Sequence, residues 1–183
     1  MSELTMKLRK NITEPQFITL GFLEQGRYII APNSGMVYDL NTERVVEPVI
    51  KGKLVEHRQC GREYVALEDK DGEVVEVGVE ILLTRTYYEL DDKRVYPHYM
   101  DGITTHNRLT NIKLVDSLEG RLDIPKRKTF PRRYEMAKQD REFGRLQDKE
   151  LIEMTLDIVI RGGVGYYIGD LLMDEAKMNY WTE

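Results

Sequence analysis

Side chains that could do chemistry gather between residues 97 and 119. The stretch 97-PHYMDGITTHNRLTNIKLV-115 holds two of the three histidines of the chain, His98 and His106. A hard divalent metal ion takes several oxygen ligands, and nearby carboxylates could supply them: Asp101, Asp116 and Glu119. Tyr99 follows His98 directly, and a phenol with a pKa of about 10 is a poor proton acceptor at neutral pH. The stretch therefore offers metal ligands, with a poor base beside the first of them.

Two short strands and a helix are predicted to position these side chains. VYPH (95–98) and IKLV (112–115) have the composition of strands, and the loop 99–110 between them is rich in Gly, Thr and Asn. Asp116 or Ser117 can cap a short helix that starts at 117. We therefore expect a β-β-α unit over residues 94–120.

The region before this unit has the pattern of a β-rich module. From 16 to 77, short runs rich in Val, Ile and Tyr alternate with turn residues, and 70-KDG-72 is typical of a hairpin. Residues 79–88 change character, because Val79, Leu82, Leu83 and Tyr87 recur at helical spacing. We predict a short amphipathic helix there, and a flexible arm before residue 16.

The C-terminal third divides by charge and by apolar pattern. Residues 121–149 contain ten Lys or Arg against five Asp or Glu, so this segment is +5 while the rest of the chain is −10. With Pro125 and Pro131 early in it, its first half is predicted to be extended and its second half a polar, exposed helix. Asp148 is predicted to cap a separate apolar helix that Gly162-Gly163 end, with shorter helices over 164–172 and 174–181.

Composition narrows the class of protein. The 183 residues are 41% hydrophobic and 32% charged, contain no apolar run of membrane-spanning length, and start without the apolar core of a signal peptide. The single cysteine, Cys60, suits a reducing compartment and excludes a Cys-rich zinc finger. The net charge of −5 argues against a general polyanion binder, so the basic segment is predicted to be either a local binding surface or a linker.

The order of these parts resembles the phage HNH homing endonucleases. Residues 22–90 resemble the small β domain of that family, through 28-YIIAPNSGMVYDL-40, Glu47-Pro48 and the helix VEILLTRTYY. Residues 97–115 resemble its central motif, His-His-x-Asp-Gly-Asn-x-x-Asn-Asn-Arg-Leu-x-Asn-Leu. Matching residues that fall in register without a gap include Gly102, Asn107, Arg108, Leu109 and Asn111. The tail resembles its small helix-turn-helix, so the resemblance covers about 22–181, most of the chain.

The resemblance assigns a role to each position of the motif. It implies that His98 is a metal ligand, that Tyr99 stands where the family has a general-base histidine, and that Asn111 braces the loop. The position that completes the metal site falls on Gly120, which has no side chain to ligate a metal. Two of the three chemical roles are therefore vacant. We expect a scaffold that has lost cleavage and needs no cofactor, with Mg²⁺ or Mn²⁺ required only if cleavage persists.

The same resemblance implies a DNA contact after the core. In the family this region lies along DNA, and here it carries cations and an aromatic residue that could contact phosphates: Lys126, Arg127, Lys128, Arg132, Arg133 and Tyr134. The alternative is a solvated linker that forms ion pairs with the acidic remainder. The last segment, DEAKMNYW, is short and lacks the side chains that read base edges, so we expect a helical cap or a protein contact there.

Together these features predict an α+β protein of five parts. These are a flexible arm (1–15), a β-rich N-terminal module (16–93), an HNH-like ββα unit (94–120), a basic linker (121–147) and a helical tail (148–183). We expect a DNA-binding protein of the cytoplasm of a phage-infected bacterium that regulates transcription or host takeover, with a host or phage transcription or replication protein as a possible partner. The alternatives are an active HNH endonuclease with a rearranged site, and an acidic adaptor or inhibitor without affinity for DNA.

Overall fold

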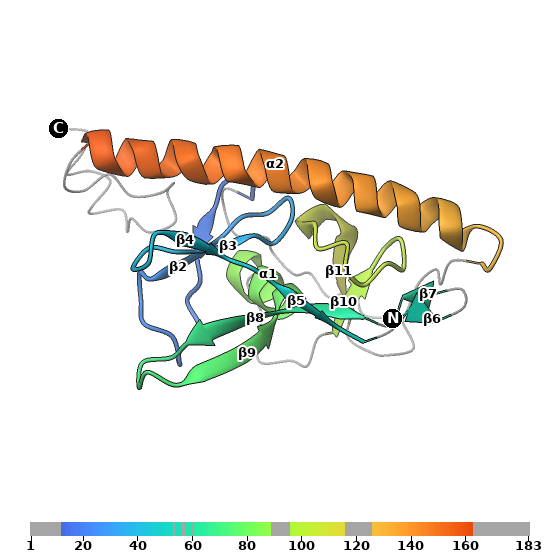
Figure 1. Cartoon of the computed structure of the whole chain (residues 1–183), viewed down its shortest axis with the longest axis horizontal. Coiled ribbons are helices and arrows are strands. Elements are labelled where there is room, and N and C mark those ends of the chain that lie inside the picture. Colours follow the sequence, from blue (N-terminus) through green and yellow to red (C-terminus); the bar gives the residue numbers. More distant parts are fainter. Residues whose placement is uncertain are drawn as a thin grey trace.

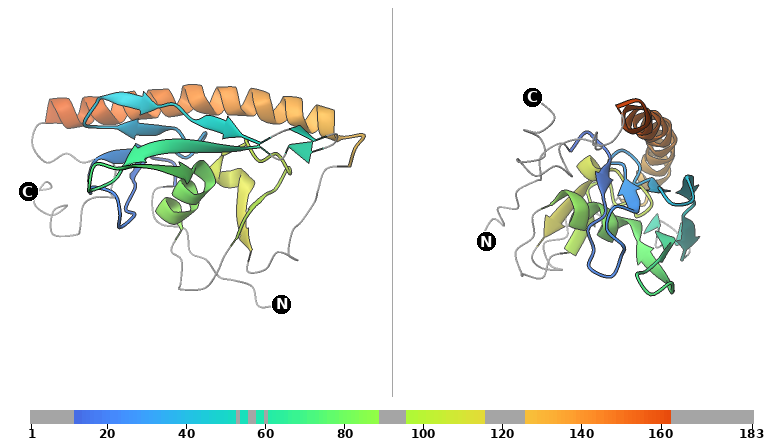
Figure 2. Two further views of the ribbon diagram at one scale, coloured as in Figure 1. Left: turned by 60° about the horizontal axis from the view of Figure 1, so that its bottom comes forward. Right: turned by 90° about the vertical axis from the view of Figure 1, so that its left-hand side faces the viewer.

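The computed structural model describes residues 12–52, 54–55, 58–59, 61–88, 96–115 and 126–162. Within them the fold is α+β, as predicted, with small antiparallel sheets and two α-helices. The longer helix, α2 (Phe130–Gly162), lies along one side of the molecule, and the sheets and α1 (Val79–Tyr87) form the body beside it (Figures 1 and 2). No helix within the described ranges is both long and apolar enough to cross a membrane.

The β-rich module contains two main sheets. The first has the order β1-β2-β3-β4 and the second the order β5-β8-β9, and all neighbours are antiparallel. Their strands are β1 (Gln16–Phe17), β2 (Tyr28–Ile30), β3 (Val37–Asp39), β4 (Arg44–Val46), β5 (Val49–Lys51), β8 (Arg62–Glu68) and β9 (Val74–Gly78). A separate pair is formed by β6 (Leu54–Val55) and β7 (Arg58–Gln59). The alternating apolar runs thus form strands where they were predicted.

The hairpin predicted at 70-KDG-72 joins β8 to β9. Asp69 holds the turn, because its Oδ1 accepts the backbone N–H of Asp71 at 2.8 Å and that of Glu73 at 2.9 Å. Gly72 has a φ of +84°, in the left-handed region that a residue without a Cβ adopts at little cost. The turn chemistry of the sequence therefore forms the predicted hairpin.

The main core lies between α1 and the sheets. The four residues of the predicted helical stripe, Val79, Leu82, Leu83 and Tyr87, are all at most 1% exposed. The hydroxyl of Tyr87 lies 2.7 Å from the Glu14 carbonyl oxygen and 2.8 Å from that of Ile30, so its single proton has an acceptor and the buried polar atom is satisfied. Ile12 also packs against this core. The chain is therefore already docked at residues 12–15, whereas residues 1–11 of the predicted arm lie outside the described residues.

The two strands of the predicted ββα unit pair as expected. In this hairpin β10 (Tyr96–Tyr99) is antiparallel to β11 (Ile112–Val115), with His98 opposite Lys113, and a single 3-10 turn, η1 (Leu109–Asn111), precedes β11. Tyr99 and Ile112 join the main core, so the hairpin packs on α1. The helix predicted from 117 lies outside the described residues.

The long helix differs from the prediction of an extended segment, a polar helix and a separate apolar helix. It runs for 33 residues without a break, so the prediction of two helices divided at Asp148 is wrong. Pro131 is compatible with this helix because the first turn needs no intrahelical N–H donor. The helix is described as far as Gly162, and the end predicted at the Gly-Gly pair falls at the limit of the described residues. The division into a linker and a tail at 147/148 thus falls inside one helix.

Candidate functional site

The cations predicted to contact DNA lie at the N-terminal end of α2 and in the turn before it. We call five of them the basic cluster: Lys126, Arg127, Lys128, Arg132 and Arg133. The first four are exposed and Arg133 is half-buried, and residues 126–133 contain no acidic side chain. Residues 134–162 contain five Lys or Arg against seven Asp or Glu. The positive charge of the predicted basic segment is therefore concentrated in this cluster.

The aromatic residues beside the cluster dock the helix. Phe130 is buried and packs with Ile103 and Ala137, and the ring of half-buried Tyr134 stacks on it with 5.8 Å between the ring centroids. This apolar contact attaches the start of α2 to the loop after β10. Tyr134, predicted among the DNA contacts, therefore has a packing role in the structure.

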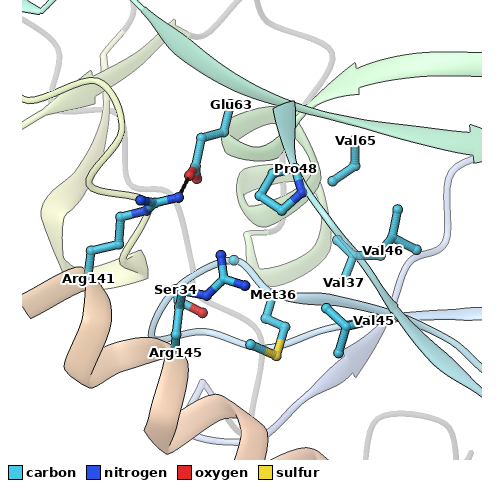
Figure 3. Close-up of a pocket in the computed structure, with 11 residues that line it drawn as sticks. Ser34, Met36, Val37, Val45, Val46, Pro48, Glu63, Val65, Arg141 and Arg145 are labelled. Atoms are coloured by element: carbon cyan, nitrogen blue, oxygen red, sulfur yellow. Dashed lines mark hydrogen bonds and ion pairs between the residues drawn. The ribbon is translucent and has the colours of Figure 1, made fainter. Parts of the chain in front are cut away.

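Cations further along α2 are paired with the acidic body. Arg141 forms an ion pair with Glu63 of β8, which is 2% exposed, and Arg145 Nη2 lies 3.0 Å from Glu47 Oε2. Figure 3 shows Arg141 reaching from α2 toward Glu63 beside a small gap lined by Ser34 and Val65. For these two arginines the alternative prediction, ion pairing with the acidic remainder, describes the structure.

The two residues that open the predicted motif are buried on β10. His98 is 9% exposed and Tyr99 is 4% exposed. The Tyr99 hydroxyl donates to Asn107 Oδ1 at 2.8 Å, and Asn107 Nδ2 donates to Glu63 Oε2 at 2.8 Å. Burial raises the pKa of Tyr99 well above its ordinary value of 10.0, helped by the negative charge of Glu80. This phenol is a hydrogen-bond donor inside the core and is unsuited to accept a proton at neutral pH.

Asn111 braces the loop between the two strands. Its Oδ1 accepts the backbone N–H of Asp101 at 3.2 Å, and its Nδ2 donates to Asp101 Oδ1 at 3.1 Å and to the His106 carbonyl at 3.0 Å. Asp101 Oδ1 also accepts the N–H of Ile103 at 2.8 Å, which closes the Asp-Gly turn. The amide is thus fully used in holding the loop shape.

His106 connects this loop to α2. Its Nδ1 lies 2.5 Å from Asp101 Oδ2, and its Nε2 lies 2.5 Å from Asp140 Oδ2. Arg108 Nη1 also reaches Asp140, at 3.3 and 3.4 Å from the two carboxylate oxygens. Burial lowers the pKa of His106, but hydrogen bonds and charge from the two carboxylates outweigh it, so the pKa is raised above 6.5. With both ring nitrogens engaged, His106 is a structural bridge.

A hollow of about 620 Å³ opens beside this bridge. Its lining comes from the loop and from the first turns of α2: Met100, Asp101, His106, Arg108, Thr110, Asn111, Arg133, Met136, Ala137 and Asp140. Among the described residues, no group of three His, Cys, Asp or Glu side chains is placed to hold a metal ion. Three positions weighed for a metal site, Asp116, Glu119 and Gly120, lie outside the described residues.

A second long-range contact fixes the middle of α2. Asp148 is fully buried, and its carboxylate accepts the N–H of Asn33 at 3.1 Å, the N–H of Ser34 at 2.5 Å and the Ser34 hydroxyl at 2.6 Å. Burial raises the pKa of Asp148 above its ordinary value, although the three donors act in the opposite direction. One turn earlier, Gly144 lies against the Asn33 carbonyl, where a Cβ would clash with that oxygen. Asp148 therefore caps the 33–34 loop, and the prediction that it caps a helix is wrong.

Sequence reasoning missed the acidic residues that join α2 to the body. Asp140 and Glu63 belong to no motif in the sequence. Of these acidic residues, only Asp148 was assigned a role from the sequence, as a helix cap. A usable signal for Asp140 was its i, i+8 spacing from Asp148 on one helix, since residues at that spacing share a face. Their partners lie more than 30 residues away in sequence, so local patterns carried no information about the pairing.

The His106 bridge makes the docking of α2 sensitive to pH. Because the pKa of His106 is higher in the folded state than in the unfolded state, protonation of His106 stabilises the fold. This contribution is complete below the unfolded-state pKa of 6.5, and it is lost as the pH rises through the folded-state pKa. We expect the melting temperature to fall as the pH rises from about 6 to about 9, and His106→Gln to remove most of that fall. Thermal melts of both proteins across this range check it, and an equal slope in both would contradict it.

Comparisons with known proteins give one similar solved structure. No family model matches the chain, and no curated protein matches it. The structure described as "DNA binding and cleavage by the HNH homing endonuclease I-HmuI" matches over 68% of this chain, with 20% sequence identity and a TM-score of 0.46. The match covers 66% of that structure's chain, just under two thirds of its length.

Proposed function

We propose that this protein binds DNA through the basic cluster at the start of α2, on an HNH-like scaffold that has lost cleavage. The observation that carries the proposal is the cluster itself, with five cations in eight residues and no acidic neighbour among them. The N-terminal end of a helix adds partial positive charge from its unpaired backbone N–H groups. Because the chain as a whole has a net charge of −5, a polyanion is expected to bind at this cluster and not over the rest of the surface.

The chemistry of the motif supports the loss of cleavage. A general base must accept a proton near neutral pH, and the buried phenol of Tyr99 has a pKa well above 10 and donates to Asn107. His106 is the other histidine of the 97–115 stretch, and carboxylates contact both of its ring nitrogens. Asp101 and Asn111 are used to hold the shape of the loop. We infer a role that depends on binding alone, such as control of transcription or of host takeover.

The binding proposal is tested with a matched pair of double variants. Lys126→Gln/Lys128→Gln removes two exposed cluster lysines, and Lys70→Gln/Lys113→Gln removes two exposed lysines elsewhere, so both variants change the net charge equally. Fluorescence anisotropy with a labelled duplex at low salt should show at least a tenfold loss of affinity for the first variant and little change for the second. Equal losses would mean that only net charge matters, and no binding by any protein would favour the adaptor alternative.

The loss of cleavage is tested separately on supercoiled plasmid with Mg²⁺ or Mn²⁺. We expect the wild-type protein to produce no more nicked DNA than a buffer control, because Tyr99, at the base position of the motif, is a poor proton acceptor near neutral pH. His98→Ala is the matched variant, since His98 is the candidate metal ligand. Robust cutting that a chelator abolishes and that His98→Ala removes would instead establish an active endonuclease with a rearranged site.

A further inference from the structure

The face of α2 that points away from the body carries an apolar stripe. Four large side chains on it are more than half exposed: Met136 (59%), Phe143 (57%), Leu146 (63%) and Met154 (62%). At about 100° per residue they fall within an arc of about 80° on the helix, an arc that also contains the exposed polar residues Gln139 and Glu150. Ala137, Gly144, Asp148 and Ile152 are buried on the opposite side. Figures 1 and 2 show α2 at the edge of the molecule, with this outer side facing away from the sheets.

The spacing of the stripe is nearly the same read in either direction. The midpoint of the pair Phe143 and Leu146 lies between residues 144 and 145. The midpoint of the pair Met136 and Met154 is residue 145. If a second α2 lies antiparallel to the first and is related to it by a two-fold axis at this point, Phe143 meets Leu146 of the second copy. Met136 then meets Met154 of the second copy. All four side chains are covered by one symmetric contact.

The charges beside the stripe fit the same arrangement. Glu142 and Lys149 are exposed on one flank of the stripe, as are Lys138 and Glu153, and each pair is centred between residues 145 and 146. An antiparallel neighbour therefore brings Glu142 beside Lys149, and Lys138 beside Glu153, across the contact. A parallel neighbour in register would instead place this flank of the two helices on opposite sides of the contact, so Glu142 and Lys149 would not meet. Charge of this kind sets the direction of helix pairing more than its strength.

We propose that two copies of this chain associate through the outer faces of their α2 helices, with the helices antiparallel. The stripe from 136 to 154 spans about 27 Å at 1.5 Å per residue, a short contact between two helices. We expect association through so short a contact to be reversible and to depend on concentration. A small interface leaves little favourable free energy once the entropic cost of association is subtracted. The basic cluster lies outside the stripe, so this inference is independent of the proposed function.

Sedimentation equilibrium on the full chain from about 1 to about 300 µM tests the contact. The weight-average mass of the wild type should rise from 21.5 kDa toward twice that value. Phe143→Glu/Leu146→Glu should stay at the monomer mass throughout, with an unchanged circular dichroism spectrum. Ile50→Glu/Val74→Glu is the matched control, because it changes two exposed apolar residues on β5 and β9, and it should associate like the wild type.

Charge exchange tests the direction of the helices. At low salt, Glu142→Lys or Lys149→Glu alone should raise the dissociation constant at least threefold, and the double exchange should restore it. A wild type that stays monomeric at every concentration overturns the proposal, as does association that Phe143→Glu/Leu146→Glu leaves unchanged. Association that the double exchange fails to restore overturns the antiparallel arrangement.

Discussion

Replacing Asp148 by Ala should lower the free energy of unfolding by about 3 kcal/mol. The carboxylate is fully buried and accepts three hydrogen bonds from Asn33 and Ser34, so its removal leaves two backbone N–H groups and a hydroxyl without their acceptor. It also leaves a small void between α2 and the loop. Urea unfolding followed by circular dichroism measures the change as a lower midpoint with an unchanged slope.

Two further substitutions make this result specific. Asp148→Asn keeps the shape and one acceptor oxygen, so it should cost less than Asp148→Ala. Glu150→Ala is the matched control on the same helix, because Glu150 is exposed, and it should change stability by less than about 0.5 kcal/mol. Equal effects of Asp148→Ala and Glu150→Ala would contradict the assignment of Asp148 as the cap of the 33–34 loop.

Replacing Glu63 by Ala should cost about 3 kcal/mol, because the ion pair that it breaks is largely buried. Glu63 is 2% exposed, and its two oxygens accept from Asn107 and from Arg141 of α2. Without Glu63, the Arg141 guanidinium and the Asn107 amide lose their acceptor. Asn107 in turn accepts the hydrogen bond that the Tyr99 hydroxyl donates. Glu63→Ala should therefore loosen the loop and α2 together.

A double-mutant cycle separates the ion pair from the rest of the network. Glu63→Gln and Arg141→Gln, alone and combined, should show a coupling free energy of about 1 kcal/mol or more. Arg145→Gln serves as the comparison, because its partner Glu47 is exposed, and its coupling with Glu47→Gln should be within about 0.5 kcal/mol. Additive effects of Glu63→Gln and Arg141→Gln would show that this pair does not hold α2 to the sheet.

Local pattern was sufficient for the β-rich module and for α1. The strands alternate in sequence, Asp69 and Gly72 provide the turn between β8 and β9, and the spacing of Val79, Leu82, Leu83 and Tyr87 defines the face of α1 that the core covers. In each case neighbours in sequence decide the structure. The same is true of the pairing of β10 with β11 across the loop that Asn111 braces.

The course of α2 depends on contacts that the sequence does not display. Asp148 before an apolar run has the appearance of a helix cap, but its carboxylate is taken by a loop more than 110 residues earlier, and the helix continues through it. Pro131 suggested an extended segment and instead lies in the first turn of the helix. Tertiary hydrogen bonds and ion pairs therefore override the local signals here.

The site was predicted in part. The basic residues at 126–133 were identified from charge together with the family resemblance, and the structure leaves most of them exposed. The role of Asp140 could not be predicted, because its partner His106 is 34 residues away. His98, Tyr99 and Asn111 were assigned through a motif, and their inactivity in catalysis stays a prediction for the plasmid assay.

The dependence of DNA affinity on salt tests the central claim most directly. Each phosphate contact contributes about 0.9 to the slope of log affinity against log salt, so five cations predict a slope of about −4.5 for the wild type. In a variant with all five cluster cations replaced by Gln, the slope should fall close to zero, and the far-ultraviolet circular dichroism should stay unchanged. A wild-type slope near zero would contradict binding through the start of α2. A slope that stays the same when all five cations are replaced would contradict it as well.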